Sequence, residues 1–247
     1  MSKKTAVIIC AAGASKRFGG KRKKPFIDIG GRAVFLRSVE LFSGRKDVGQ
    51  IILAISPEDQ ELVDVKWGAN LQFFNVKICQ GGAERFETVK NCLELVKDDI
   101  ELVAVHDAAR CCVKEKWIDE CFAKAGQTGA AMLASRVVAT LKRVEGGIIS
   151  ETVDRNNLYE AQTPQVFSRE LIFKAYGKLE ELDKSTITDD SQLVEAVGGQ
   201  VSIVETDSSN VKITHKSDIA IVEAIVKERF NKNKPKGPLG PFAEAQW

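Results

Sequence analysis

Runs of consecutive apolar residues recur along the chain, and segments with helical spacing of apolar residues separate them. A strand that is apolar at every position is buried on both faces, which is typical of a parallel sheet covered by helices on both sides. The pattern therefore predicts an α/β fold with a doubly wound, mostly parallel sheet. The predicted strands are 7–11, 51–55, 76–79, 102–105 and 130–134. The predicted helices are 34–42, 57–66, 84–96 and 114–125.

The pattern changes after residue 134. Residues 137–143 and 148–153 alternate in polarity on either side of Gly146-Gly147, which predicts two antiparallel strands joined by a tight turn. We therefore expect an antiparallel hairpin arm at about 137–155.

The rest of the chain is predicted more coarsely. We expect a loop around Thr163-Pro164-Gln165, helices from about Ser168 and Asp190, a strand at 201–204 and a closing helix at 215–230. A length of 247 residues suits a single domain, which we place at 1–230. Residues 231–247 hold three of the six prolines and predict a disordered tail.

Composition excludes several classes of protein. The chain has 36 Lys and Arg against 34 Asp and Glu, a net charge of +2, so it has no overall basic field for nucleic acid or an anionic membrane. No apolar run approaches the roughly 18 residues of a membrane span. The six cysteines lack paired zinc-site spacing and predict buried thiols in a reducing, cytoplasmic location. A redox role for Cys111-Cys112 stays open as the alternative to two ordinary thiols.

Small residues and cations follow the first predicted strand. The stretch is Ala11-Ala12-Gly13-Ala14-Ser15-Lys16-Arg17, with further cations up to Lys24. Small residues let backbone N–H groups approach phosphate oxygens, and the cations add charge there, so the stretch predicts a phosphate-binding loop. It matches neither the dinucleotide fingerprint nor the Gly-Lys-Ser/Thr loop. The alternative is a glycine turn followed by a solvated basic run.

Two further strand ends carry comparable residues. Gly81-Gly82 follows the third strand, with Arg85 and Thr88 in the next helix, and the fourth strand ends in 105–110, Val-His-Asp-Ala-Ala-Arg. An aspartate at this edge is well placed for Mg²⁺, or another divalent cation, bound to phosphates, which predicts Asp107 as a metal ligand. A helix cap for Asp107 and a surface ion pair for Arg110 are the alternatives. His106 is expected to be a hydrogen-bonded structural residue.

These motifs resemble one family when taken together. Ala11-Ala12-Gly13 with Arg17 and Lys24, Gly81-Gly82, 105–110, 152–155, 163–165, 188–190 and 210–214 match, in order and spacing, the 2-C-methyl-D-erythritol 4-phosphate cytidylyltransferases. The resemblance covers residues 5 to 230. It implies transfer of CMP from CTP to methylerythritol phosphate with release of pyrophosphate, and a homodimer clasped by the arm.

The resemblance also implies roles for individual residues. The catalytic cations are expected to be Arg17, Lys24 and Lys212. The nucleotide is expected to contact Ala11, Ala12, Gly13, Ala14, Ser15, Gly81, Gly82, Arg85, Thr88, Asp107 and Ala108. The methylerythritol phosphate is expected to contact Arg110, Thr140, Arg155, Thr163 and Thr188, with Arg155 and Thr140 reaching across from the second subunit. Many members of the family have glycine where Ser15 stands.

Two other functions compete with this one. A ribitol 5-phosphate cytidylyltransferase uses the same phosphate loop and differs mainly in its contacts to the polyol. A regulatory or scaffold protein with the same fold binds the nucleotide without turnover. An enzyme is favoured over a protein that only binds the nucleotide, because the chain has Arg17, Lys24, Asp107 and Lys212.

Overall fold

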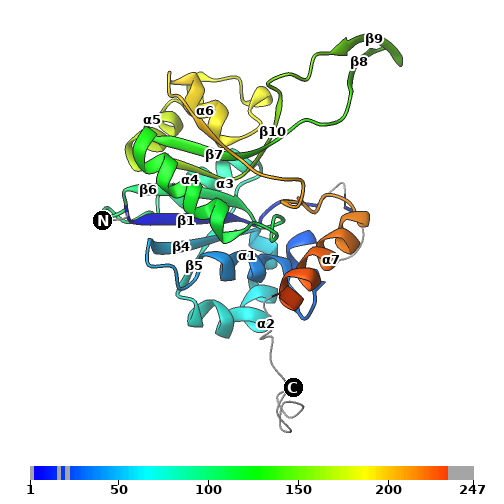
Figure 1. Ribbon diagram of the computed structural model, residues 1–247. Helices are drawn as coiled ribbons and strands as arrows, with labels where there is room; N and C mark the ends of the chain where they lie inside the picture. The colour runs from blue at the N-terminus through cyan, green and yellow to red at the C-terminus, as the bar shows by residue number, and fades with distance from the viewer. Residues whose placement is uncertain (1–2, 16–17, 20–22, 233–247) are drawn as a thin grey trace.

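A seven-stranded sheet forms the centre of the computed structural model, which describes residues 3–15, 18–19 and 23–232. Its strands are β1 (Thr5–Cys10), β4 (Val48–Ile55), β5 (Val76–Gln80), β6 (Leu102–Asp107), β7 (Ala130–Arg136), β10 (Tyr159–Ser168) and β11 (Ser202–Glu205). They lie in the order β11-β7-β10-β6-β1-β4-β5 (Figure 1). Every neighbouring pair is parallel except the two pairs that involve β10. The predicted doubly wound, mostly parallel sheet is confirmed.

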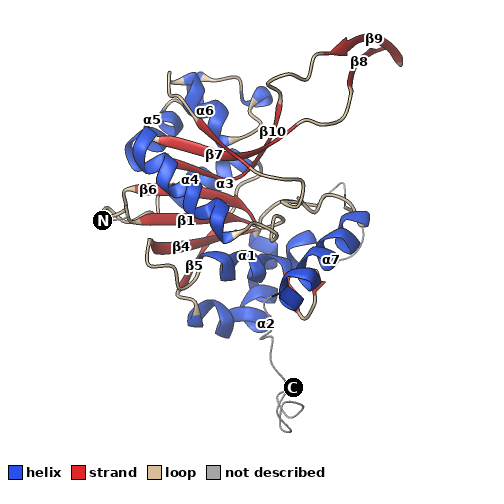
Figure 2. Cartoon of the chain, viewed as in Figure 1, coloured by secondary structure: helices blue, strands red, loops and turns tan. Residues whose placement is uncertain are grey.

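Helices cover both faces of the sheet (Figure 2). On one face lie α1 (Val34–Phe42), α2 (Gln60–Phe73) and α4 (Glu115–Thr128), and on the other lie α3 (Arg85–Leu93), α5 (Arg169–Gly177) and α6 (Asp190–Ala196). Alternate residues of β1 enter the two cores, with Val7 and Ile9 in one and Ala6 and Ile8 in the other. The continuous apolar runs of β1, β4 and β6 therefore have the predicted cause, since both faces of these central strands are buried, whereas the edge strands β5 and β11 are partly exposed.

The expected loop around Thr163-Pro164-Gln165 is wrong, because these residues lie inside β10. β10 pairs antiparallel with both β6 and β7, and its register with β7 shifts between Ala161 and Gln165. Proline has no N–H group and cannot donate to the ladder, so the pairing is interrupted there. The polar residues that suggest a loop are buried and bonded by side chains, as Gln162 Nε2 donates to Ser135 Oγ at 3.0 Å.

The predicted arm is present as a two-stranded hairpin of β8 (Leu141–Glu145) and β9 (Ile148–Val153). Gly146 and Gly147 have φ values of +57° and +83°, which only glycine adopts readily, and this explains the Gly-Gly turn. The hairpin projects away from the body of the molecule (Figure 1).

Shorter elements complete the chain. A small hairpin of β2 (Asp28–Ile29) and β3 (Arg32–Ala33), not predicted, follows the 3₁₀ turn η1 (Lys24–Phe26). Three more 3₁₀ turns are η2 (Pro57–Asp59), η3 (Leu179–Glu181) and η4 (Lys184–Thr186). The closing helix α7 (Ser217–Lys232) packs on a third apolar cluster that includes Cys112 and Ile213. It runs two residues past the predicted boundary at 230, and residues 233–247 of the predicted tail lie outside the described residues.

Two further predictions concern the whole chain. All six cysteines fall within the described residues and are free thiols, five of them buried. Among the described helices, none combines the length and the apolar composition needed to cross a bilayer.

Candidate active site

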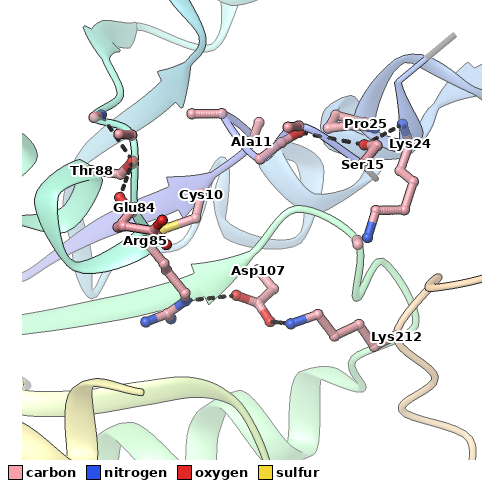
Figure 3. A pocket seen from close by; sticks show the side chains of 16 residues that line it. Cys10, Ala11, Ser15, Lys24, Pro25, Glu84, Arg85, Thr88, Asp107 and Lys212 are labelled. Carbon is pink, nitrogen blue, oxygen red and sulfur yellow. Dashed lines mark hydrogen bonds and ion pairs between the residues drawn. The ribbon is translucent and has the colours of Figure 1, made fainter. Parts of the chain in front are cut away.

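A cavity of about 420 Å³ opens where the loops after β1, β5 and β6 meet. This is the carboxyl edge of the sheet, where ligands bind in open α/β folds. Eleven of the predicted site residues line it (Figure 3): Ala11, Ala12, Gly13, Ala14, Ser15, Lys24, Gly82, Arg85, Thr88, Asp107 and Lys212. Cys10, Pro25, Ala83, Glu84 and Ala109 also line it and were not predicted, although each adjoins a predicted residue.

The loop after β1 presents backbone to the cavity. The N–H of Ala11 donates to Ala54 O at 2.8 Å and ends the sheet ladder. In the part of the chain that the structure describes, no hydrogen bond occupies the N–H groups of Ala12, Gly13 and Ala14. Ser15 has a φ of +54°, and its hydroxyl accepts a hydrogen bond from the N–H of Lys24 at 3.1 Å. The loop therefore presents backbone donors that suit phosphate oxygens.

The loop after β5 requires both of its glycines. A Cβ at Gly81 would overlap the Cβ of Ala12, and one at Gly82 would overlap the side chain of Glu87. The N–H of Gly82 donates to Thr88 Oγ1 at 3.1 Å, which ties the loop to α3. Gly81 thus brings the β1 and β5 loops into contact, and Thr88 fixes the second loop.

Asp107 is the single carboxylate at the end of β6 and lies at the floor of the cavity. Its Oδ2 accepts from Lys212 Nζ at 2.5 Å, and its Oδ1 accepts from Arg85 Nε at 3.3 Å (Figure 3). Burial alone would raise the pKa of Asp107, but the positive charges of Arg85, Lys212 and Arg110 outweigh it and hold the pKa well below its usual range. Asp107 is therefore ionised at physiological pH.

Arg85 extends this cluster into the protein interior. Its Nη1 donates to Asp190 Oδ2 at 2.7 Å, and Asp190 is 1% exposed. The hydroxyl of Tyr176 donates to the other oxygen of Asp190 at 2.6 Å. Burial alone would lower the pKa of Arg85, but Asp190 and Asp107 raise it well above its ordinary value. No role was predicted for Tyr176, and the only signal for Asp190 in the sequence was its place in the 188–190 motif.

The arrangement is suited to polyanions. The lining of the cavity includes three cations, Lys24, Arg85 and Lys212, and two carboxylates, Asp107 and Glu84, so cations outnumber carboxylates there. Cations fixed in a site that excludes water stabilise phosphate charge more strongly than cations in solution. The cavity can therefore hold a triphosphate and stabilise charge that develops on it.

Asp107 fits as the one protein ligand of a divalent cation. Among the described residues, no three His, Cys, Asp or Glu side chains gather into a metal site. Mg²⁺ commonly takes one or two carboxylates and completes its shell with phosphate oxygens and water. Each oxygen of Asp107 accepts one hydrogen bond from a cation and keeps a second lone pair, which is available for a metal.

Other predicted residues lie behind or beside the cavity. Ala108 is buried beneath it, and its N–H donates to Cys10 O. Thr163 Oγ1 accepts from the N–H of Asp107 at 3.0 Å, and Arg110 Nη1 donates to Asn210 O at 2.8 Å. These residues support the Asp107 segment from within the protein.

The residues that were predicted to contact the methylerythritol phosphate do not lie together within one chain. Thr188 lines a separate cavity of about 460 Å³ between β7, β10 and α6. Thr140 and Arg155 are exposed just before β8 and just after β9, at the base of the arm, where Arg155 Nη1 donates to Val138 O. Predicted catalytic residue Arg17 lies outside the described residues.

His106 is fully buried and does not line the cavity, in keeping with the structural role expected for it. Its Nδ1 lies 3.1 Å from Thr163 Oγ1, and its ring meets that of Phe42 edge to face. Burial lowers its pKa to about 4. The ring is therefore neutral at physiological pH.

Comparison with known proteins gives one family. The family model of 2-C-methyl-D-erythritol 4-phosphate cytidylyltransferase matches residues 5–228. An enzyme of that name from Endomicrobium trichonymphae is 42% identical over 91% of this chain and 99% of its own length. One from Rhodopirellula baltica is 40% identical over 90% of this chain and 95% of its own length.

Solved structures agree with the relatives. The 4-diphosphocytidyl-2C-methyl-D-erythritol synthase of Anaerococcus prevotii superimposes with a TM-score of 0.78 at 28% identity, over 92% of this chain and 97% of that one. The 2-C-methyl-D-erythritol 4-phosphate cytidylyltransferase of Thermus thermophilus gives a TM-score of 0.74 at 30% identity, over 90% and 98%. The chain belongs to the 2-C-methyl-D-erythritol 4-phosphate cytidylyltransferase family.

Proposed function

We propose that the cavity binds CTP and that the chain transfers CMP from CTP to 2-C-methyl-D-erythritol 4-phosphate. The observation that carries this proposal is the excess of cations around Asp107, beside a loop of open N–H groups, in a chain of this family. As a member of the family the chain is a nucleotidyltransferase, which argues against a regulatory protein without turnover. The relatives' names favour methylerythritol phosphate over ribitol phosphate as the acceptor.

The chemistry requires charge neutralisation and no general base. The second pKa of a phosphate monoester is about 6, so the acceptor is largely a dianion at neutral pH. One of its oxygens attacks the α-phosphorus in line, the bond to the β-phosphate breaks, and pyrophosphate leaves. Lys24 and Lys212, with Arg17, would stabilise the crowded anionic transition state. The absence of a base from this scheme agrees with the buried, neutral His106.

The nucleotide would lie across the loops after β1 and β5. Ala12 to Ala14 would donate N–H groups to phosphate oxygens, and the close approach allowed by Gly81 and Gly82 would suit the flat cytosine ring. Mg²⁺, or another divalent cation, would be held by Asp107 and by the triphosphate. When bound, it would neutralise charge on the phosphates.

The acceptor would be bound between two subunits of a homodimer. Neither Thr140 nor Arg155 lines the cavity of its own chain, and the hairpin between them projects away from the body of the molecule (Figure 1). The arm also exposes apolar side chains, including Val138 at 80% and Ile148 at 75%, which are costly in water and suit contact with a second copy. The partner's arm would bring Thr140 and Arg155 to a site shared with Arg110, Thr163 and Thr188.

Pyrophosphate release tests the reaction. CTP and Mg²⁺ are incubated with methylerythritol phosphate, with ribitol 5-phosphate, or with no acceptor. Release with methylerythritol phosphate alone is expected. Preferential release with ribitol 5-phosphate, or none with either acceptor, would reject the proposed substrate.

Subunit mixing tests the shared site. Arg155→Ala and Lys212→Ala would each inactivate a homodimer, whereas a heterodimer of the two has one intact shared site. Partial recovery of activity is expected in purified heterodimers. No recovery would mean that each chain builds its own acceptor site.

We also propose a cytoplasmic location, which the six free thiols support because thiols stay reduced in that compartment. Recovery of the native enzyme in a membrane or secreted fraction of its cells would contradict it.

A further inference from the structure

Lys23 is next to the cavity-lining Lys24, but its side chain makes a different set of contacts. Its Nζ forms ion pairs with Glu58 and with Asp59, the latter at 2.7 Å. The side chain of Asp59 is 10% exposed and that of Glu58 is 69% exposed. Solvent screens the Glu58 pair, so the Asp59 pair is the one that fixes Lys23.

Asp59 depends on this contact. Among the described residues, Lys23 alone pairs with its carboxylate. A nearly buried carboxylate without a partner is strongly disfavoured, so Asp59 retains its contact with Lys23. Burial alone would lower the pKa of Lys23, but Asp59 and Glu58 raise it, which keeps Lys23 charged.

Asp59 is itself held by the core. It ends η2, where its N–H donates to Ser56 O at 2.9 Å, and η2 joins central strand β4 to α2. Trp67 of α2 stacks on Phe26, with ring centroids 5.5 Å apart. The anchor of Lys23 and the residues after Lys24 are therefore parts of one packed unit.

The backbone of Lys24 is fixed from a second direction by Ser15. The Ser15 hydroxyl accepts from the Lys24 N–H at 3.1 Å, and its φ of +54° lies in a region that serine occupies at a cost of roughly 1–2 kcal/mol. Figure 3 shows this bond beside the Lys24 side chain at the cavity. Lys24 is thus held through its own N–H group by Ser15 and through its neighbour Lys23 by Asp59.

We infer that Lys23 and Asp59 form a clamp that positions Lys24 for the reaction. The inference rests on the proposed function, in which Lys24 contacts the reacting phosphates. Lys23 and Asp59 act through Lys24 and touch no substrate. Displacement of a catalytic group by about 1 Å can lower a rate by up to 10²-fold, so a modest loosening of the clamp has a measurable effect.

Lys23→Gln and Asp59→Asn test the clamp by steady-state pyrophosphate release. Each is expected to lower kcat by about tenfold, with the KM for CTP within about twofold of the wild type. The double variant is expected to be no slower than either single variant, because one contact is lost in all three. The matched control is Lys4→Gln, which breaks the exposed Lys4–Asp99 pair at the opposite edge of the sheet and leaves kcat unchanged.

The path through Lys24 has its own test. In a Lys24→Ala background, Lys23→Gln is expected to lower kcat no further. Unchanged kcat in the single variants, or a full additional loss in the Lys24→Ala background, would overturn the clamp.

Hydrogen exchange tests the clamp without substrates. The Lys24 amide is expected to exchange about tenfold faster in Lys23→Gln than in the wild type, because its bond to Ser15 opens more often. The melting temperature shows that the variant is folded. Unchanged exchange at the Lys24 amide would reject the clamp even if the enzyme is active. A wild type that releases no pyrophosphate would reject the proposed function. In that case the exchange measurement alone would test the clamp.

Discussion

The cavity and the arm carry the same types of charged side chain in opposite surroundings. In the cavity, Asp107 and Asp190 hold Arg85 between them, and their side chains are 11% and 1% exposed. On the arm, Arg143 pairs with Glu151 while both are more than half exposed. Ion pairs fix geometry where burial removes competing water, and contribute little where water remains. The cavity is therefore preorganised within one chain, whereas the charged side chains of the arm lie on a hairpin that is exposed to solvent.

The largest expected effect is on rate and concerns Lys24. Lys24→Ala should lower kcat by a factor on the order of 10² or more with a modest change in CTP affinity, because the cation acts mainly in the transition state. Steady-state kinetics measures both quantities, and Lys116→Ala, on an 81% exposed side chain of α4, is the control. A change confined to KM would assign Lys24 to ground-state binding and weaken the case for a preorganised cavity.

The next effect is on stability and concerns Asp190. Asp190→Ala leaves Arg85 and the Tyr176 hydroxyl without their buried partner, and should lower the free energy of unfolding by about 3 kcal/mol. Asp190→Asn keeps hydrogen-bonding atoms in place and should lower the free energy of unfolding by less than Asp190→Ala does. Urea unfolding measures both. Equal, small losses would show that the interior cluster is no more stabilising than the arm.

The next effect is on the pH dependence of stability and concerns His106, which is buried in the body of the molecule. Its pKa is lowered to about 4 by burial, so the unfolded chain takes up a proton at higher pH than the folded chain does. Stability should therefore fall as pH drops from about 6.5 to about 4, by about 3 kcal/mol for this group. His106→Gln should remove that part of the slope in urea unfolding measured across this range. The same slope in the variant would assign the acid sensitivity to other groups.

The smallest effect is expected on the arm. Glu151→Ala breaks the exposed Arg143–Glu151 pair and should change the free energy of unfolding by less than about 0.5 kcal/mol. Urea unfolding at low and high salt measures it. A loss comparable to that of Asp190→Ala would show that the arm is packed against something in solution, and would break the comparison.

The architecture could be predicted from the sequence, because the pattern of apolar residues within a segment reflects which of its faces are buried. Continuous apolar runs such as 51–55 and amphipathic segments such as α1 are local patterns, and they predicted the sheet, the helices and the edge at which the site forms. Ala12, Gly82 and Asp107 were predicted for the same reason, since parallel strands bring the residues after their carboxyl ends to one edge.

Tertiary structure alone decided the contacts between distant segments. The polar residues around Pro164 suggested a loop, yet side-chain hydrogen bonds from separate segments let them lie inside a buried strand. The partners of Arg85 and Lys23 are Asp190 and Asp59, which are 105 and 36 residues away along the chain. No local pattern specifies such pairings, because they depend on which side chains the packed core brings together and shields from water.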